Sequence, residues 1–389
     1  MSFYFANDIP YLKDLESELI NAWLEIDLKK YESNIDYLKS LLHPKTKLMQ
    51  VVKADAYGHG AIHIAKKAEE IGVSYLGVAN IAEGKILRLS NIKLPILVLA
   101  SIFENQIEYA IKNDLHITIT SLESILEIDN VAFKINKIAK THLKIDTGMG
   151  RVGIREENID RAIELLKQTK NISLDGVFTH FAESEDLNSN FTNEQITIFK
   201  KAIEKIKNAG FQDFITHCAN SSAILVQPES HFDMVRIGIA GYGIGDPIKE
   251  KLQQILTLKS KVINIKKVPK NSSLGYKRSF FTKKDSTMAI IPIGYADGLP
   301  RILSNNQNVI INDEFYPICG NISMDQCVID ISDSQNDILS RIKIGDEIIL
   351  LGESKSKNIL IEEWARKSYK ITYEVLCSFG NRLPRFYID

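Results

Sequence analysis

The chain has 389 residues, of which 44% are hydrophobic and 25% are charged, and its formal net charge at pH 7 is -1. This composition is typical of a soluble globular protein, and the near-zero charge argues against a partner bound mainly through phosphates, such as nucleic acid, or a membrane surface. The length is too great for one ordinary core and predicts two domains, one of which could be a barrel.

The N-terminus and the cysteines predict a cytoplasmic protein without a metal. Residues 1–23 lack the basic start and the apolar core of a secretory signal, and no stretch is apolar for long enough to span a bilayer. The cysteines show no metal-ligand spacing, so we expect reduced thiols and no metal site. They are Cys218, Cys319, Cys327 and Cys377.

Short apolar runs alternate with helical patterns over most of the first 240 residues. Eight runs have the features of strands: 48–53, 75–79, 95–100, 116–120, 141–146, 174–180, 214–217 and 232–236. Helical patterns between them include 62–71, 157–168 and 194–208. Eight strands alternating with helices predict a (β/α)8 barrel of the TIM type. A doubly wound open sheet is the alternative, but no GxGxxG turn follows the first strand.

The pattern changes after about residue 245. Strand-like runs separated by turns follow, such as "MAIIPIGYADG" and "GDEIILLG", and only "IEEWARK" has a helical pattern. We therefore predict an α/β barrel domain over residues 21–250 and a mainly β C-terminal domain over residues 251–389. Residues 1–20 would form an N-terminal extension.

Polar residues gather where the predicted barrel strands end, which is where barrel enzymes carry their chemistry. They are Lys53 after the first strand, Lys144, Asp146 and Arg151 around the fifth, His180 after the sixth, His217 and "ANSS" after the seventh, and Arg236 and Gly238 at the eighth. Any one of them alone would more often be structural. Their shared position at the rim is what favours a functional site.

Lys53 is the candidate nucleophile of this rim. Partial desolvation or cationic neighbours favour a neutral lysine amine, which can form a Schiff base with a carbonyl compound or with pyridoxal phosphate. Barrels often bind phosphate in the loops after strands seven and eight, where this chain has Ser221, Ser222 and Gly238. Alone, "ANSSAI" would more often be a helix cap. The phosphate interpretation therefore depends on the lysine.

Nine strings, in this order, closely resemble alanine racemase, a family of pyridoxal phosphate enzymes: "VVKADAYGHG", "LKIDTGMGRVG", "THFAES", "HCANSSAIL", "MVRIGI", "SLGYKRSF", "IPIGYADG", "CGNISMDQ" and "TYEVLC". The resemblance extends from about Trp23 to Arg385. It implies a barrel followed by a β domain, a homodimer with shared active sites, and D-alanine supply for the cell wall.

The resemblance also implies two bases. Lys53 would hold the cofactor and act on D-alanine, while Tyr276, supplied by the other subunit, would act on L-alanine. Racemisation removes a proton from one face of the α-carbon and returns one to the other, which a single group cannot do from one position. A free tyrosine hydroxyl keeps its proton at neutral pH, so its phenolate must be favoured by nearby positive charge or hydrogen bonds.

The remaining site residues are assigned through the same resemblance. The cofactor-phosphate contacts would be Tyr57, Ser221, Gly238, Ile239 and Tyr373. Arg236 would contact the pyridine nitrogen, and His180 would bridge Arg236 and the tyrosine base. Arg151 and the backbone N–H of Met324 would hold the substrate carboxylate, because an arginine fork suits a carboxylate.

Lys144 and the substrate range leave alternatives open. Lys144 matches a lysine that is carbamylated in many family members, and the alternative is an ordinary lysine paired with Asp146. A racemase with a broader or serine-preferring pocket would keep the same motifs. Barrel-type amino-acid decarboxylases share the architecture but should lack a tyrosine base in the "GYKR" context. Non-catalytic single barrels that carry the cofactor lack a β domain, so residues 256–389 argue against them.

Overall fold

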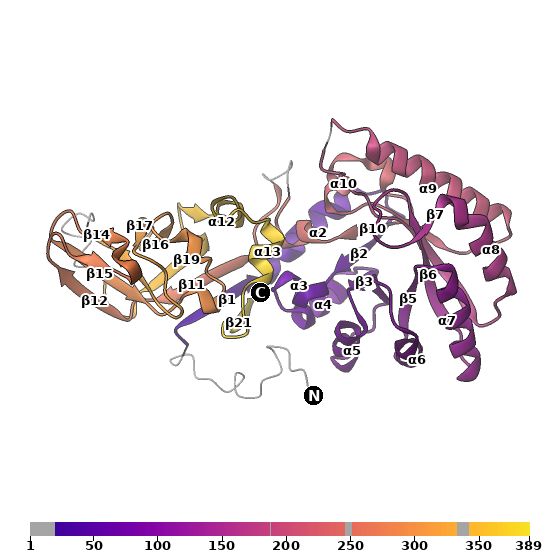
Figure 1. Cartoon of the computed structure of the whole chain (residues 1–389), viewed down its shortest axis with the longest axis horizontal. Coiled ribbons are helices and arrows are strands. Elements are labelled where there is room, and N and C mark those ends of the chain that lie inside the picture. The colour runs from indigo at the N-terminus through magenta and orange to yellow at the C-terminus, as the bar shows by residue number, and fades with distance from the viewer. Residues whose placement is uncertain (1–19, 187, 246–250, 333–341) are drawn as a thin grey trace. The chain divides into compact units, whose positions relative to one another are not determined.

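The structure is a computed structural model that describes residues 20–186, 188–245, 251–332 and 342–389 (Figure 1). The chain forms two compact units. Of the described residues, the barrel unit contains those within 30–56 and 61–253, and the β unit contains those within 20–29, 57–60 and 254–389. The predicted N-terminal extension, apart from Ile20, lies outside the described residues.

The barrel unit has eight parallel strands that close on themselves. They are β2 (Lys47–Val51), β3 (Tyr75–Val78), β4 (Ile96–Val98), β5 (Leu115–Ile119), β6 (Ala139–Asp146), β8 (Ile172–Phe178), β9 (Ile215–His217) and β10 (Met234–Ile237). Neighbours pair in the order β5-β4-β3-β2-β10-β9-β8-β6, and β6 pairs back to β5. The short strand β7 (Ile154–Arg155) continues beside β6. The predicted barrel is confirmed, because in an open sheet β5 and β6 would be edge strands that do not pair with each other.

Helices surround the barrel sheet (Figure 1). They are α2 (Leu28–Ser40), α4 (Ala61–Glu70), α5 (Ile81–Leu89), α6 (Glu104–Lys112), α7 (Leu122–Lys134), α8 (Ile159–Gln168), α9 (Phe191–Asn208) and α10 (Ser221–Val226). Each longer helix places one apolar face on the sheet, as α8 does with buried Ile159, Ile163 and Leu166. None of the helices in the described ranges is long and apolar enough to cross a bilayer.

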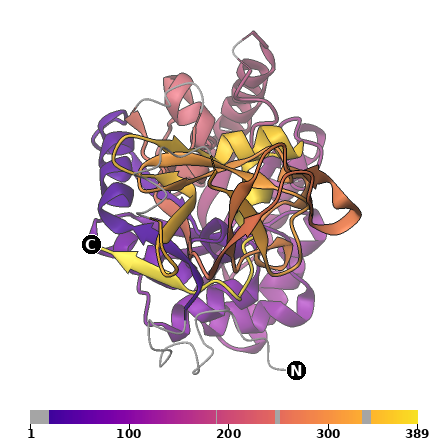
Figure 2. The same cartoon turned by 90° about the vertical axis from the view of Figure 1, so that its left-hand side faces the viewer.

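The β unit is built on a ten-stranded sheet, most of whose strands are coloured orange to yellow in Figure 2. Its strands are β1 (Ala22–Asp27), β11 (Leu256–Lys261), β12 (Asn264–Val268), β15 (Ser286–Ile291), β16 (Asn308–Ile311), β17 (Glu314–Cys319), β18 (Cys327–Asp330), β19 (Glu347–Glu353), β20 (Asn358–Ile359) and β21 (Arg385–Ile388). A ribbon of β13 (Ser273–Leu274) and β14 (Phe280–Phe281) and the helices α12 (Ile361–Ser368) and α13 (Thr372–Cys377) complete the unit.

Two segments differ from the predicted domain boundaries. Strand β1 was expected at the start of the barrel domain, but it pairs antiparallel with β11 and parallel with β21 in the β unit. The segment Tyr57–Gly60 also belongs to the β unit, where Gly58 O accepts a hydrogen bond from Arg385 Nε at 3.2 Å. Both segments bond to residues that lie more than two hundred positions away in the sequence, so a local sequence pattern could not predict these pairings.

Candidate active site

Lys53 begins a short turn, α3 (Lys53–Tyr57), that has the uncommon left-handed conformation. The φ angles of the four residues after Lys53 are 52°, 52°, 54° and 53°. This conformation costs about 1–2 kcal/mol for each non-glycine residue, so the surrounding structure must hold it. Asp55 Oδ1 accepts the N–H of Ala61 at 2.7 Å, and Glu83 Oε1 accepts the N–H of Ala54 at 2.8 Å. Ala54 and Asp55 are therefore both held by hydrogen bonds within the barrel unit.

Glu83 is a residue of this site that sequence reasoning missed. Its second oxygen, Oε2, accepts the N–H of Ala79 at 2.7 Å, so one carboxylate joins the Lys53 turn to the chain leaving β3. The only signal in the sequence was an acid in the first turn of a helix capped by Asn80, whose Oδ1 accepts the N–H of Glu83. That pattern is common in ordinary helix caps and does not indicate a site.

Arg236 lies in β10 with only 4% of its surface exposed, and it is surrounded by hydrogen-bond acceptors. Nη1 donates to His217 Nδ1 at 2.9 Å, and Nη2 lies 2.7 Å from Thr179 O, 2.9 Å from Cys218 O and 3.3 Å from His180 Nδ1. Burial lowers the pKa of Arg236 to about 10, so it stays charged at neutral pH. In the described part of the chain no carboxylate pairs with it and Nε makes no hydrogen bond. This buried cation therefore has a donor left for an acceptor outside the protein.

His180 follows β8 by two residues and is neutral. Burial, and then the charge of Arg236, lower the pKa of His180 to about 3. Its Nδ1 must accept from Arg236, because a guanidinium has donors alone, so Nε2 carries the proton. His180 thus offers one fixed N–H beside the arginine.

Lys144 is a buried lysine with cationic neighbours. It is 5% exposed, and its Nζ lies 5.3 Å from the centre of the Phe178 ring. Burial, followed by the charges of Arg236 and Arg151, lowers the pKa of Lys144 to about 8, and Lys53 contributes in the same direction. The structure therefore brings Lys53, Lys144, Arg151 and Arg236 close enough to affect one another's charge.

Asp146 fixes the loop that leads to Arg151. Its Oδ1 accepts the N–H groups of Gly148 at 3.2 Å and Gly150 at 3.0 Å. Within the described residues no ion pair joins Asp146 to Lys144, and the charge of Asp146 only partly offsets the effects that lower the pKa of Lys144. Arg151 itself is exposed, which leaves its guanidinium open to an anion.

The loops after the last two barrel strands contain Ser221, Gly238 and Ile239, the predicted phosphate contacts of the barrel unit. Ser221 Oγ accepts the N–H of Gly238 at 2.9 Å and that of Ala240 at 3.3 Å, so the two loops meet at this hydroxyl. Ile239 begins the 3-10 turn Ile239–Tyr242 beside it. Ser222 Oγ is buried and has no hydrogen-bond partner among the described residues. A buried hydroxyl without a partner, one residue after Ser221, is suited to binding an anion such as phosphate.

The other predicted site residues lie in the β unit. The rings of Tyr57 and Tyr373 have centroids 5.6 Å apart, tilted by 58°. Tyr276 and Met324 are 70% and 51% exposed. The carbonyl of Met324 accepts from Ala296, whereas its N–H makes no hydrogen bond within the described ranges. The described residues contain no group of three or more His, Cys, Asp and Glu side chains arranged to hold a metal.

Two family models together cover most of the chain. The model described as alanine racemase, N-terminal domain, matches residues 26–246, and the model described as alanine racemase, C-terminal domain, matches residues 255–387. Among curated proteins, alanine racemase 1 of Oceanobacillus iheyensis is 38% identical over 373 residues, which is 95% of this chain and 98% of that protein.

Solved structures give the same result. An alanine racemase of Clostridium difficile 630 has a TM-score of 0.88 and 38% identity, with 95% of this chain and 96% of that chain covered. The alanine racemase of Bartonella henselae, solved with covalently bound pyridoxal phosphate, has a TM-score of 0.83 and 29% identity, covering 95% and 100%.

Proposed function

Because the chain belongs to the alanine racemase family, which makes it an amino-acid isomerase, we propose that it interconverts L- and D-alanine with pyridoxal phosphate and two bases. The observation that carries the cofactor assignment is the buried, charged Arg236, which lacks a carboxylate partner in the described part of the chain and lies in the same barrel unit as Lys53. The product D-alanine would serve peptidoglycan synthesis.

The cofactor would be held at several points by this chain. Lys53 would bond it covalently, on the turn that Glu83 braces. The phosphate would take the donors of Ser221 and of the loop at Gly238 and Ile239, together with the hydroxyls of Tyr57 and Tyr373. Ser222 Oγ joins this set, since its burial without a partner is relieved by an anion. When bound, pyridoxal phosphate withdraws electrons from the substrate α-carbon and so makes its proton removable.

Arg236 would limit how far that withdrawal goes. A guanidinium that keeps its proton donates to the pyridine nitrogen and leaves the nitrogen itself unprotonated. The weaker electron sink disfavours side reactions such as transamination. Burial lowers the pKa of Arg236 only to about 10, which supports a permanently charged donor near neutral pH.

Two bases would move the α-proton. Lys53 would take or return it on one face and Tyr276 on the other, and Tyr276 would come from the partner subunit of a homodimer. The exposed side chain of Tyr276 is compatible with a role at another subunit's site. Arg151 would bind the substrate carboxylate with its fork, and the N–H of Met324, unbonded in the described residues, would add a second donor.

Lys144 would be carbamylated in the active enzyme. Carbamylation adds carbon dioxide to a neutral amine and releases one proton, and the pKa of about 8 makes that amine accessible near neutral pH. The product is an anion, which would replace the repulsion of Lys144 by Arg151 and Arg236 with attraction. Arg151 would then be held for the carboxylate.

The function is tested by incubating the purified protein with L-alanine in heavy water and separating the enantiomers. We expect D-alanine labelled at the α-carbon, and recovery of unlabelled L-alanine alone would refute racemisation. Release of carbon dioxide would point to a decarboxylase instead. A panel of other amino acids, serine first, would measure the substrate range. Borohydride reduction followed by peptide mapping should find the cofactor on Lys53.

A further inference from the structure

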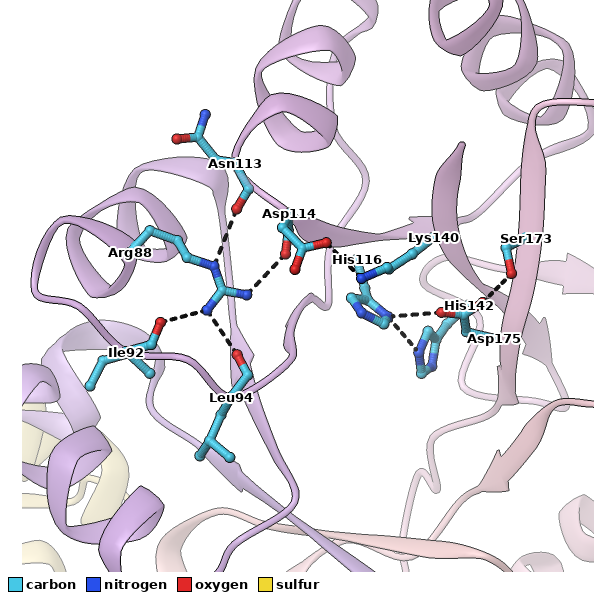
Figure 3. Close-up of polar contacts among 10 residues, drawn as sticks. All are labelled: Arg88, Ile92, Leu94, Asn113, Asp114, His116, Lys140, His142, Ser173 and Asp175. Atoms are coloured by element: carbon cyan, nitrogen blue, oxygen red, sulfur yellow. Dashed lines mark hydrogen bonds and ion pairs between the residues drawn. The ribbon is translucent and has the colours of Figure 1, made fainter. Parts of the chain in front are cut away.

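Three histidine rings connect Arg236 to the opposite end of the barrel interior. His217 closes β9, and its Nε2 lies 3.0 Å from Nδ1 of His142 in β6. Nε2 of His142 lies 3.4 Å from Nδ1 of His116 near the start of β5. The line ends at Asp175 in β8, whose Oδ2 is 3.7 Å from the same Nδ1 (Figure 3). We call His217, His142 and His116 the histidine column.

The barrel makes room for this column where an apolar side chain would ordinarily fill the core. His217 and His142 are fully buried, and Phe178 stacks on His217 with ring centroids 4.8 Å apart and an interplanar angle of 3°. A Cβ on Gly176 would lie 2.2 Å from Nδ1 of His142, so no larger residue fits there without moving the ring. Buried polar rings are retained at a cost unless their hydrogen bonds are satisfied.

The arginine gives the column a direction. Arg236 can only donate, so Nδ1 of His217 must be the acceptor and Nε2 must carry the proton. The same reasoning passes to His142, which accepts at Nδ1 and donates from Nε2. It then passes to His116, whose Nδ1 accepts in turn and therefore has no proton to donate to Asp175. All three rings therefore have the same tautomer, with the proton on Nε2, and the donor that determines it is Arg236.

The far end holds His116 between charges of both signs. Asp175 faces its Nδ1 and also accepts from Ser173, while Lys140 and Asp114 form an ion pair of 2.7 Å nearby (Figure 3). Arg88 lies beside Asp114, and its guanidinium donates to four backbone carbonyls: those of Ile92, Leu94, Asn113 and Asp114 (Figure 3).

These charges largely oppose one another at His116. Burial is the largest effect and lowers the pKa of His116 to about 4; Asp175 and Asp114 act in the opposite direction, and Lys140 and Arg88 in the same direction. The ring is neutral at physiological pH, as its acceptor role requires. Burial and the charge of Arg236 also hold the pKa values of His142 and His217 well below the ordinary value, so the whole column is neutral.

We propose that His217, His142 and His116 are positioning residues that hold the guanidinium of Arg236 in the orientation in which Nε is left for the cofactor ring nitrogen. The inference rests on the proposed function, since the ring nitrogen belongs to the proposed cofactor. With Nη1 on His217 and Nη2 on Thr179 O, Cys218 O and His180, the plane of the guanidinium is fixed. If His142 is absent, His217 can carry its proton on Nδ1 instead of Nε2. The N–H at Nδ1 would then face the N–H of Arg236, and two donors facing each other would displace the arginine.

The first test compares His142→Leu with His231→Leu in the cofactor-loaded enzyme. His231 is a matched control, because it is another buried histidine of the barrel unit and its Nε2 contacts the carbonyl of Ile224, away from the column. The absorbance of the bound cofactor is titrated with pH, and its midpoint is the pH at which half of the change has occurred. For His142→Leu we expect this midpoint to shift by about one unit. We also expect kcat to fall about tenfold with little change in KM. His231→Leu should leave the midpoint in place. Equal midpoints in both variants and the parent would overturn the proposal.

The second test begins with the parent protein, so its first result does not depend on the folding of a variant. Solid-state 15N NMR of the histidine-labelled parent protein, with and without cofactor, should show Nε2 protonated and Nδ1 bare in all three rings. A protonated Nδ1 on His217 or His142 would contradict the proposed order of hydrogen bonds in the histidine column. Gly176→Ala adds a variant that keeps every imidazole but displaces His142, and it should shift the absorbance midpoint in the same direction as His142→Leu.

The outcomes separate the two proposals. A protein that neither binds pyridoxal phosphate nor racemises alanine refutes the proposed function, whatever the NMR shows. A protein that racemises alanine normally, with an unshifted midpoint in His142→Leu, refutes only the positioning role of the column.

Discussion

Glu83 Oε1 accepts the N–H of Ala54 at 2.8 Å, and Ala54 directly follows the predicted cofactor lysine. The contact holds a left-handed turn that would otherwise relax, because non-glycine residues disfavour that conformation. We expect Glu83→Ala to lower the free energy of unfolding by about 1–3 kcal/mol, since two backbone N–H groups lose their acceptor. It should also weaken cofactor binding. Urea denaturation and cofactor titration measure both effects.

Glu164→Ala provides the control for that experiment. Glu164 lies on α8 of the same unit and makes an exposed ion pair with Arg161 at 2.9 Å. Exposed pairs contribute about 0–1 kcal/mol, so this variant should resemble the parent in both measurements. A Glu83→Ala protein that is as stable as Glu164→Ala and binds cofactor equally well would contradict the bracing role.

Ser222→Ala should separate cofactor affinity from stability. Ser222 Oγ is buried with no partner among the described residues, so its removal costs the unliganded protein nothing or stabilises it slightly. If the hydroxyl binds the cofactor phosphate, its loss should raise the cofactor Kd about tenfold, the size of one hydrogen bond to a charged group. Ser230→Ala is the contrasting control, because Ser230 Oγ donates to Gln227 O at 2.7 Å. That variant should lose stability and keep its affinity; the reverse pattern would count against the phosphate site.

Lys144 predicts a rise in stability at alkaline pH. Its folded-state pKa of about 8 lies below the ordinary 10.5, so the unfolded chain binds the proton more tightly between these values. The unfolding free energy of the uncarbamylated protein should therefore increase with pH across this window, relative to Lys144→Met, by about 1–3 kcal/mol. Chemical denaturation near pH 7.5 and pH 10 measures the difference. A fall across the same window has the wrong sign for a buried cation and would refute the assignment.

Tyr276→Phe should affect the two enantiomers unequally. A phenyl ring cannot accept a proton, whereas Lys53 remains able to remove one from D-alanine. We expect α-proton exchange of L-alanine in heavy water to fall about 10²–10⁴-fold, the usual size of a general-base contribution, and that of D-alanine to fall much less. Tyr369→Phe, a change at a 90% exposed tyrosine of the same unit, serves as control. Equal losses for both enantiomers would exclude the two-base scheme.

The barrel was predictable because its signals are local. Each strand is a short apolar run ended by a turn, and each helix has apolar residues at helical spacing. The alternation of eight strands with helices could therefore be predicted before any contact was known. The predicted 48–53, 141–146 and 232–236 became β2, β6 and β10 with small shifts at their ends. Residues that end such strands, Lys53 and Arg236 among them, could be named as rim residues from the same pattern.

Three other features depend on partners distant in sequence. Strand β1 joins β11 and β21 through hydrogen bonds to residues more than two hundred positions away. Glu83 reads as a helix-cap acid until its oxygens are seen on Ala54 and Ala79. From the sequence, His116 and His142 are ordinary residues of predicted strands. Their contact with each other and with His217 is seen only in the closed barrel.

The sequence by itself therefore determined the strand and helix pattern, the lysine and arginine at the strand ends, and the motifs that resemble alanine racemase. Each of these depends only on residues that are neighbours in the sequence. Only the tertiary structure decided which backbone N–H groups donate to Glu83, which sheet β1 enters and that His217 connects Arg236 to His142 and His116. Those facts follow from the closure of the barrel, which brings β5, β6, β9 and β10 around one interior, and from the inability of a buried guanidinium to accept a hydrogen bond.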